Sequence, residues 1–383
     1  MAIQSNTGWP DYSQASDDDL ALEAGSAPSL ADAARSDAIE LVVEAGARGE
    51  RLDRWLAQRI DGVSRTRLQH WIGCGAVLVD GVARPAASRL AGAERVRVAP
   101  LPREADAAFA PDPVPLSIVH EDDDLLVLDK PAGLVVHPAP GNWRGTLMNG
   151  LLHHRPAQAR LPRAGIVHRL DKDTSGLMVV ARSERALVSL GRQLASRAAG
   201  RGYLALAEGA LGTAARLVDA PLGRDPVSRT RIAVVPGGRE ARTRIWPLAR
   251  GDLGAVGVGL ALCRLDTGRT HQIRVHLRHI GHPLVGDPVY GGRLGEAGGI
   301  GRQALHAWRL ELDHPADATR MRWQSSVPPD LRTAIEAAGI DLQAALAEAG
   351  RIDPKAAPGD ATRRAAQGDA PRRAAHSAQG ATR

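Results

Sequence analysis

The residues from 164 to 181 bring together the kinds of side chain that enzymes use for chemistry. The segment reads Ala-Gly-Ile-Val-His-Arg-Leu-Asp-Lys-Asp-Thr-Ser-Gly-Leu-Met-Val-Val-Ala. Short apolar runs at 166–167 and 177–181 predict two strands joined by a polar loop. Two carboxylates, Asp171 and Asp173, lie in this loop with a histidine, two cations and two hydroxyls. Catalytic groups concentrate on loops that a rigid sheet holds, whereas a solvated structural turn would need only Gly176 and one Asx residue.

Three common chemistries do not fit these residues. His168-Arg169-Leu170-Asp171 differs from the kinase catalytic loop, which reads His-Arg-Asp with a downstream Asn that 164–181 lacks. No Gly-Lys pair occurs in the chain, which excludes a P-loop. His271, His276 and His279 are not spaced as the i, i+4 pair of a zinc-binding helix, and no acidic ligand stands among them. We therefore expect no metal site.

The loop resembles the active-site motif of the RNA pseudouridine synthases of the large-subunit rRNA type. The resemblance rests on His168-Arg169-Leu170-Asp171 followed by Thr174-Ser175-Gly176. Further motifs of this family match in the same order: Lys130-Pro131-Ala132-Gly133-Leu134-Val135-Val136-His137-Pro138, Leu265-Asp266-Thr267-Gly268-Arg269-Thr270-His271-Gln272-Ile273-Arg274, Gly286-Asp287-Pro288-Val289-Tyr290-Gly291 and Leu305-His306-Ala307. So many ordered motifs make a chance match improbable.

The resemblance implies an isomerase that turns uridine into its C-glycoside. In that reaction the N-glycosidic bond breaks, the base rotates, and a carbon–carbon bond forms. Positive charge develops on the sugar, as in glycoside hydrolysis, and a carboxylate can stabilise that charge or bond to the sugar. Asp171 holds the position of the family's catalytic aspartate; Asp173, its rival, lies outside the pattern. The implied chemistry needs no cofactor.

The same resemblance suggests roles for other residues. Arg269 would be the cation that keeps Asp171 ionised against the effect of burial. Tyr203 would stack on the target base and assist proton transfer, although a role in the core remains an alternative. Arg169 would fill the space that the flipped nucleotide leaves, since a flat guanidinium stacks on bases. His168 and His271 would lie near the RNA.

Some questions remain open at the level of sequence. Asp171 could attack the sugar or assist elimination to a glycal. The resemblance implies uridines of 23S rRNA in the stem-loop called helix 69 as targets. Two other functions are possible: a non-catalytic RNA-binding or ribosome-assembly factor on the same fold, and a retaining glycosidase. The glycosidase would need a second carboxylic acid as proton donor, for which Asp173 is the only local candidate.

A small module precedes the motifs, at 48–99. Apolar residues at helical spacing predict a helix over 52–60, and Ser64 is placed to cap a second helix. Asp80-Gly81 between apolar residues predicts a hairpin, and 95–98 alternates as a strand. The module resembles the S4-type RNA-binding domain. Arg65 and Arg67 in the first turn of the second helix oppose its dipole, whereas a bound phosphate would favour them. We therefore expect both to contact RNA.

A larger domain follows a Pro-rich linker at 100–115. Residues 116–340 contain strand-like runs at 116–120, 125–128, 134–136, 177–181, 203–207, 231–235, 242–246 and 259–265, and helical patterns at 146–154, 184–199 and 271–280. Many strands with few crossover helices predict an α+β fold with a mixed, largely antiparallel sheet. The acidic segment 1–40 and the basic segment 351–383 lack apolar patterns, so both are predicted to be disordered.

Composition agrees with a soluble RNA-binding protein. The net charge is +6, and a basic balance favours a polyanionic partner such as 23S rRNA. All but Lys130, Lys172 and Lys355 of the 49 bases are arginines, so charge alone does not separate RNA binding from genome composition. Cys74 and Cys263 have neither the number nor the spacing for a disulfide framework. Without a signal pattern or an apolar membrane span, we expect a cytoplasmic monomer with no membrane partner.

Overall fold

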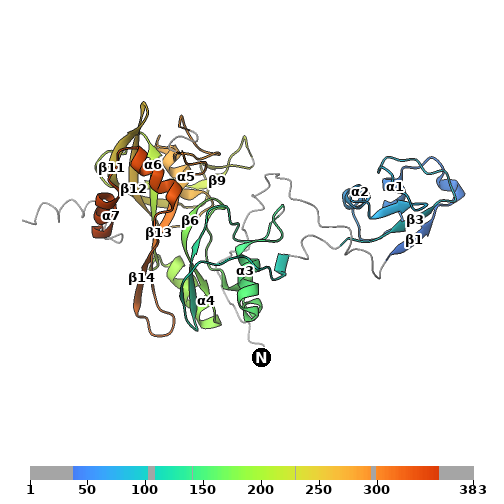
Figure 1. Cartoon of the computed structure of the whole chain (residues 1–383), viewed down its shortest axis with the longest axis horizontal. Helices are drawn as coiled ribbons and strands as arrows, with labels where there is room; N and C mark the ends of the chain where they lie inside the picture. The colour runs from blue at the N-terminus through green and yellow to red at the C-terminus, as the bar shows by residue number, and fades with distance from the viewer. Residues whose placement is uncertain (1–37, 102–107, 140, 229, 295–298, 353–383) are drawn as a thin grey trace, which may run out of the picture. The chain divides into compact units, whose positions relative to one another are not determined.

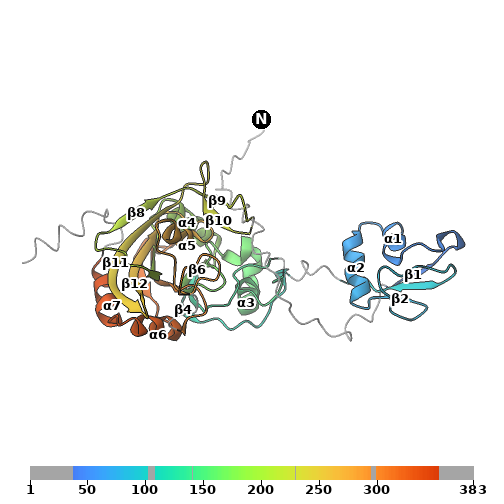
Figure 2. The ribbon, with the colours of Figure 1, turned by 90° about the horizontal axis from the view of Figure 1, so that it is seen from above.

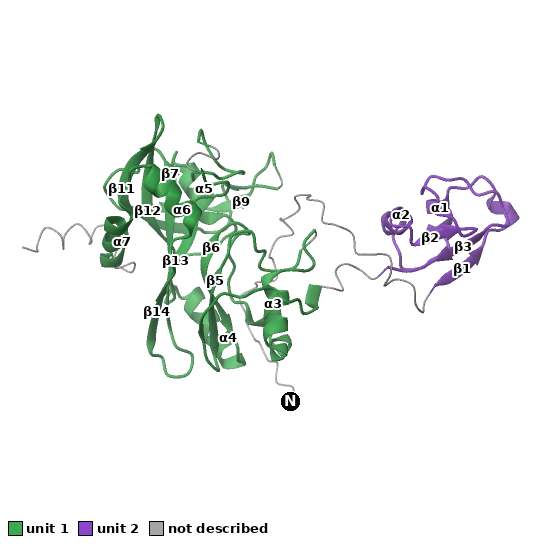
Figure 3. Cartoon of the chain, viewed as in Figure 1, with its two compact units in different colours: residues 1–21, 108–383 green, residues 22–107 purple. Residues whose placement is uncertain are grey.

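A computed structural model describes residues 38–101, 108–139, 141–228, 230–294 and 299–352. The described residues divide into two compact units, one that ends at 101 and one that begins at 108 (Figure 3). The predictions of disorder for 1–40 and 351–383, and that of a linker at 100–115, fall wholly or partly outside the described residues.

The first unit is a three-stranded antiparallel sheet with two helices. Its strands are β1 (Ile39–Val42), β2 (Val77–Val79) and β3 (Arg95–Val98), in the order β1-β3-β2, and its helices are α1 (Leu52–Ala57) and α2 (Arg65–Gly73). Residues of β3 alternate between solvent and core, and Val96 and Val98 pack inward with Trp55 and Trp71. The sequence does not predict strand β1, because its first residues fall in the segment that is predicted to be disordered.

Two local signals in this unit have the structure that the sequence predicts. Ser64 caps α2, and its hydroxyl accepts a hydrogen bond from the amide of Arg67 at 3.4 Å. Asp80 and Gly81 adopt φ angles of 51° and 80°, the left-handed pair that a two-residue hairpin turn of type I′ requires. Val79 and Val82 pair across this turn.

The second unit is organised around a nine-stranded sheet (Figures 1 and 2). Its order is β4-β5-β6-β13-β7-β12-β11-β8, with β14 paired to β13. The strands are β4 (Ile118–Glu121), β5 (Leu125–Lys130), β6 (Ser175–Ala181), β7 (Gly200–Glu208), β8 (Arg216–Asp219), β11 (Arg242–Leu253), β12 (Val256–Leu265), β13 (Leu305–Asp313) and β14 (Arg320–Gln324). Only β6 and β13 pair in parallel among the described strands, which confirms the α+β class with a largely antiparallel sheet.

Two of the predicted strands are absent. Residues 134–136 form no strand, and the pair 166–167 contributes only a single bridge, between Ile166 and Val180. Two short strands, β9 (Leu222–Arg224) and β10 (Ile232–Val234), form a separate two-stranded antiparallel sheet. The predicted run at 231–235 therefore lies outside the large sheet.

Apolar residues cover both faces of the large sheet, which explains why its central strands read as continuous apolar runs. On β7, Tyr203, Ala205 and Ala207 share a core with helices α3 (Leu147–His154) and α5 (Gln272–His279). Leu204 and Leu206, which alternate with them, pack with α6 (Pro329–Ala337) and α7 (Leu342–Arg351). Helix α4 (Glu184–Ala195) packs on alternate residues of β5 and β6.

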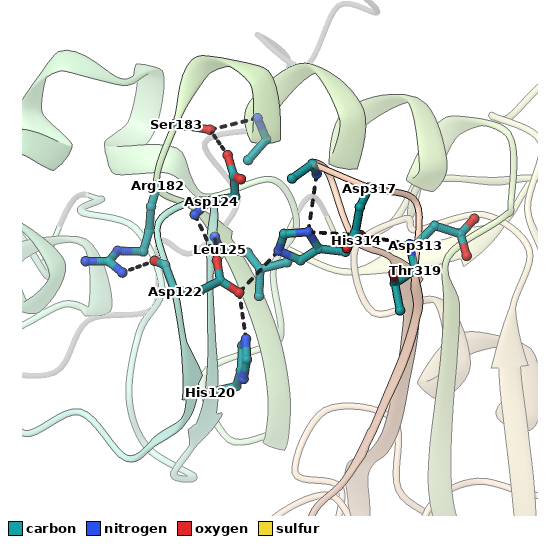
Figure 4. Close-up of polar contacts among 12 residues, drawn as sticks. His120, Asp122, Asp124, Leu125, Arg182, Ser183, Asp313, His314, Asp317 and Thr319 are labelled. Atoms are coloured by element: carbon teal, nitrogen blue, oxygen red, sulfur yellow. Dashed lines mark hydrogen bonds and ion pairs between the residues drawn. The ribbon is translucent and has the colours of Figure 1, made fainter.

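A polar network ties one end of this sheet together (Figure 4). The Asp122 carboxylate lies 2.7 Å from His120 Nε2 and 3.2 Å from His314 Nε2. The hydroxyl of Ser183 donates to Asp124 at 2.6 Å and accepts from the amide of Ala186, so it also caps α4. The network thus joins the β4–β5 turn to α4 and to the turn after β13.

None of the helices in the described parts of the chain has the length and apolarity that crossing a membrane requires.

Gly176 allows the parallel contact between β6 and β13. Its φ is +114°, and a Cβ placed there would lie 2.3 Å from the carbonyl oxygen of Ala307. We expect Gly176→Ala to lower the free energy of unfolding by about 3 kcal/mol or more, through overpacking and backbone strain. Urea unfolding measures this. Gly191→Ala is the matched control, since a Cβ added at Gly191 in α4 would have no atom within 4 Å. That change should stabilise the protein by about 0.5–1 kcal/mol, and an equal loss in both variants would contradict the prediction.

Candidate active site

Asp171 lies in the loop that leads into β6, on the face of the sheet that α3 and α5 cover. Its side chain is 16% exposed, and the preceding Leu170 is buried in the core cluster that includes Tyr203. The loop closes on itself, because the amide of Thr174 donates to the carbonyl of Asp171 at 3.0 Å. Asp171 therefore presents a partly exposed carboxylate from a fixed backbone.

Lys130 holds this loop from the side of β5. Its side chain is 1% exposed, and its Nζ donates to the carbonyl oxygens of Pro131, Leu134 and Lys172 at 2.8–2.9 Å. The amide of Gly133 donates to the same Lys172 carbonyl. Burial lowers the pKa of Lys130 to about 7, against the attraction of nearby carboxylates in the loop. Lys130 thus holds the backbone carbonyls of two segments together and is not exposed to a substrate.

A second clamp reaches the loop from the segment before β13. Arg302 Nη1 donates to the carbonyl of Asp173 at 3.0 Å, while its other nitrogens bind the carboxylate of Asp330 at the start of α6. Gln303 donates to the Thr174 hydroxyl at 3.1 Å. The next residue, Ser175, has its hydroxyl 3.0 Å from Nδ1 of a buried histidine, His306. Each residue from 172 to 175 is consequently held by a side chain from elsewhere in the fold.

The carboxylate of Asp171 is paired with a buried guanidinium. Arg274 Nη1 donates to Asp171 Oδ2 at 3.1 Å. The same Arg274 binds Asp287 through two parallel hydrogen bonds, from Nε at 2.7 Å and from Nη2 at 2.9 Å. Asp287 also accepts from the amides of Val289 and Tyr290. One guanidinium therefore serves two carboxylates, and the fully buried Asp287 sets its orientation.

These charges decide the ionisation of Asp171. Burial by itself raises the pKa of a carboxyl group. The charges of His271, Arg274 and Arg169 and the hydrogen bond from Arg274 outweigh that effect, so the pKa of Asp171 is lowered. The site therefore holds an ionised carboxylate in a largely dry position, which suits a nucleophile or a group that stabilises positive charge.

The ion pair corrects one assignment from the sequence. The resemblance implies Arg269 as the partner of Asp171, but this role falls to Arg274. Arg269 is exposed, and its Nε donates to the carbonyl of Glu240 at 3.1 Å. Its amide is held by Gln272 in a turn before α5. The helix therefore directs Arg274 into the site, whereas Arg269 remains at the surface.

Tyr203 and His271 both lie within electrostatic range of Asp171. Tyr203 is 3% exposed, and its pKa is raised. Burial is the main cause and the negative charge of Asp171 adds to it, while the positive charge of Arg201 acts in the opposite direction. It belongs to the core cluster, as the structural alternative predicts, and it borders the site at the same time. His271 precedes α5 in a left-handed conformation, with its Nδ1 2.9 Å from the hydroxyl of Tyr290.

His168 and Arg169 differ in their surroundings. The Nε2 of His168 accepts a hydrogen bond from the amide of Val179 at 3.1 Å, and burial lowers the pKa of His168 to about 3. The neutral imidazole of His168 thus helps to hold the loop on β6, and its contact with RNA stays a prediction. Arg169 is half-buried, and its charge acts on both Asp171 and His137.

Arg65 and Arg67 belong to the first unit, and both have partners within it. Arg65 donates to Asp53, a buried carboxylate, at 2.9 Å. Arg67 donates to the carbonyl of Leu101 at 2.8 Å and lies over the ring of Trp71. These contacts explain two cations at the start of a helix without a bound phosphate. Contact of Arg65 and Arg67 with RNA stays a prediction.

Four residues of the site receive no role from the sequence alone: Lys130, Arg274, Asp287 and Tyr290. Each lies inside a motif that the resemblance includes, so a signal is present. Arg274 lies in the same motif as Arg269, at the only other arginine position of 265–274, which is the signal that could have indicated it. No group of three or more His, Cys, Asp or Glu side chains is arranged for a metal ion in the described parts of the chain.

Comparison with known proteins places these features in a family. The family model described as RNA pseudouridylate synthase matches residues 124–279. "Ribosomal large subunit pseudouridine synthase D" of Nitrosomonas europaea is 48% identical, over 78% of this chain and 87% of the relative. The protein of that name from Escherichia coli is 45% identical over 77% of this chain and 92% of the relative. The solved structure of human RNA pseudouridylate synthase domain containing 1 aligns with a TM-score of 0.50 and 26% identity, over 64% of this chain and 98% of that one.

Arg274→Lys tests which arginine controls Asp171. Lysine keeps the charge but lacks the planar fork that binds Asp287 through two parallel hydrogen bonds while a third nitrogen reaches Asp171. We therefore expect the pKa of Asp171 to rise towards its ordinary value. A carboxyl whose folded pKa is depressed stabilises the fold above its unfolded pKa, and this contribution is lost as the pH falls through the folded pKa. The variant should therefore lose less stability on acidification than the wild type. It should also be less stable at neutral pH, by about 2 kcal/mol.

Carbon-13 NMR titration of the aspartate carboxyls measures the pKa, with Asp171→Asn to assign the signal. Arg269→Lys is the matched control and should leave the pKa of Asp171 unchanged. If Arg269→Lys raised it and Arg274→Lys did not, the partner would be Arg269 after all.

Proposed function

The chain belongs to the RNA pseudouridylate synthase family and is an isomerase, and from this premise we propose that it forms pseudouridine in the 23S rRNA of the large ribosomal subunit with Asp171 as its nucleophile. The names of the relatives support rRNA as the substrate. The observation that carries the proposal is the ionised Asp171 on a clamped loop that also bears the family motif.

The reaction that we propose begins at the glycosidic bond. The bond between uracil N1 and the anomeric carbon breaks, and its electron pair leaves with the base. The Asp171 carboxylate either bonds to the anomeric carbon or assists elimination to a glycal. After the base rotates, C5 bonds to the anomeric carbon; on the first route the bond from Asp171 breaks and its electron pair returns to the carboxylate, and on the glycal route the proton taken from C2′ goes back to that carbon. C5 then loses its proton and N1 gains one. Atoms and charge balance without a redox step, so we propose that the enzyme needs no cofactor.

Arg274 supports this chemistry through its placement. An ionised carboxylate is required before either form of the first step, and Arg274 favours that form while Asp287 shares the guanidinium. Tyr203, which borders the site, supplies an aromatic ring of low exposure for contact with the base. Its raised pKa keeps the phenol protonated, so its hydroxyl can donate a hydrogen bond; a part for Tyr203 in proton transfer rests on the family resemblance.

RNA recognition follows from the need to reach a stacked base. A nucleotide must leave its stack before Asp171 can reach the sugar, and this costs least in a loop. Arg169, adjacent to the site, is our candidate for the side chain that takes the place of the flipped base. The family resemblance supports helix 69 of 23S rRNA as the target stem-loop. Exposed Arg269 and half-buried His271 are candidates for contacts with the flanking RNA.

The first unit supplies a separate function in this proposal. We assign residues 48–99 to an S4-like RNA-binding domain, joined by the linker 100–115 to a catalytic domain at 116–340. The two helices and the three-stranded sheet of the first unit, whose strand β1 precedes these bounds, bear arginines on the outside, such as Arg95 and Arg97 on β3. Phosphate contacts position a protein on RNA but carry no chemistry. We propose that the enzyme acts as a cytoplasmic monomer.

Asp171→Asn tests the nucleophile. The amide is nearly isosteric but carries no negative charge, so isomerisation should fall to a few per cent of the wild type or less, while RNA binding survives. Tritium release from 5-tritiated uridine in 23S rRNA measures the reaction, and filter binding measures affinity. Asp173→Asn is the matched control two residues away and should retain activity. Activity in the Asp171 variant together with its loss in the Asp173 variant would move the nucleophile to Asp173.

Deletion of residues 1–100 tests the division of labour. We expect weaker RNA binding with a shallower salt dependence, since fewer counterions are released. The single-turnover rate on a saturating short stem-loop should stay within about twofold of the intact protein, because phosphate contacts do not take part in the chemical step. Circular dichroism would establish that the shortened protein is folded. A folded protein with a collapsed single-turnover rate would show that the first unit contributes to the active site.

A further inference from the structure

The hydroxyl of Tyr290 joins two segments that lie next to the Arg274 ion pair. It accepts a hydrogen bond from the amide of Ile232 in β10 at 2.9 Å. It also lies 2.9 Å from Nδ1 of His271, the residue that precedes α5. Tyr290 itself is 3% exposed. A buried hydroxyl with two partners at this distance fixes the position of both.

The ring and backbone of Tyr290 contact the ion pair as well. The guanidinium of Arg274 lies over the ring, 5.1 Å from its centroid, and the His271 ring stands edge-on at 5.5 Å. The amide of Tyr290 donates to Asp287, the second carboxylate of Arg274. Tyr290 therefore contacts each of the groups that place Arg274 against Asp171.

His271 needs such an anchor because its backbone is strained. Its φ and ψ are 54° and 20°, and although it is the N-cap residue of α5, its side chain forms no capping hydrogen bond with the helix. A residue other than glycine in the left-handed region costs about 1–2 kcal/mol and persists only where its surroundings hold it. Strain of this kind concentrates at functional sites. The bond to Tyr290 holds the imidazole one helical turn before Arg274.

The other partner, β10, belongs to the small two-stranded sheet. Strands β9 and β10 pair with each other, and Val227, which follows β9, is 94% exposed. Arg224 and Arg231 are exposed on the same hairpin. Through Tyr290, the position of this hairpin is tied to the start of α5, and α5 carries the guanidinium that pairs with Asp171.

We propose that Tyr290 is a positioning residue of the enzyme, whose hydroxyl holds His271 and Arg274 in register with Asp171 and couples their placement to the β9–β10 hairpin. The inference rests on the proposed function, since it concerns the reaction at Asp171. It assigns to the hydroxyl an effect on the chemical step, beyond its contribution to folding.

Tyr290→Phe is the direct test, since it removes the hydroxyl and keeps the ring under Arg274. We expect kcat on a saturating stem-loop to fall about tenfold, the size of one lost hydrogen bond, with KM within about twofold. The acid limb of the pH–kcat profile should move to higher pH, because Arg274 then holds Asp171 less well in its ionised form. Unchanged kcat and an unchanged acid limb would overturn the proposal.

A double-mutant cycle distinguishes positioning from a general loss of stability. Glycine accepts the left-handed backbone, so His271→Gly removes the imidazole without added strain. In that background Tyr290→Phe should lower kcat by less than about twofold further, because the hydroxyl has already lost its contact with His271 and keeps only the hydrogen bond from the Ile232 amide. Independent, additive losses would overturn the coupling. All variants are compared at a temperature at which circular dichroism shows each of them folded.

Trp246→Phe is the matched control. Trp246 is an aromatic residue with 3% exposure in the core cluster of α6 and α7, and its indole nitrogen lacks a hydrogen-bond partner among the described residues. Its change should lower the melting temperature while leaving kcat and the acid limb in place. An equal fall in kcat would overturn the proposal in favour of a purely structural effect. Activity of Asp171→Asn would instead refute the proposed function, whatever the result at Tyr290.

Discussion

A buried guanidinium between two carboxylates is the interaction on which the candidate active site depends. A charge taken out of water is costly unless it is paired and fully hydrogen-bonded, and Arg274 meets this condition only where Asp171 and Asp287 converge. Asp287 contributes the two parallel bonds, which leave one nitrogen for Asp171. The pair is therefore asymmetric: the buried carboxylate orients the arginine, and the partly exposed one remains available to a substrate.

The need to pair Arg274 with Asp171 explains why several parts of the fold contact the short loop at 171–175. Asp171 must meet an arginine on α5, so the loop before β6 needs a fixed path. Lys130 from β5 and Arg302 from the segment before β13 bind successive carbonyls of this loop. Gly176 then allows β6 to approach β13 closely. The nine-stranded sheet serves here as a frame that brings three separate stretches of chain to one carboxylate.

Local structure was predictable where the signal depended on neighbouring residues. The cap at Ser64 and the turn at Asp80-Gly81 follow from side-chain and backbone preferences within a few positions. The runs at 177–181, 203–207 and 259–265 became strands because both faces of the sheet are covered. Residues 134–136 are apolar too, but their backbone groups bond to Lys130 and to the start of α3, and no strand forms. Periodicity cannot separate these cases, since it does not show which backbone groups are already bonded.

The sequence by itself determined the family and the α+β class and pointed to Asp171 as the central residue of the candidate site, because motifs of this kind are runs of adjacent residues. The tertiary structure alone decided which arginine pairs with Asp171. Arg269 and Arg274 lie in one motif, far along the chain from the aspartate, and both carry the same charge. Helix α5 turns Arg274 inward and the preceding turn leaves Arg269 at the surface, a difference of direction that composition and spacing do not contain. The role of Tyr290 is likewise a matter of contacts, since Ile232 and His271 meet only where the folded chain brings β10 beside α5.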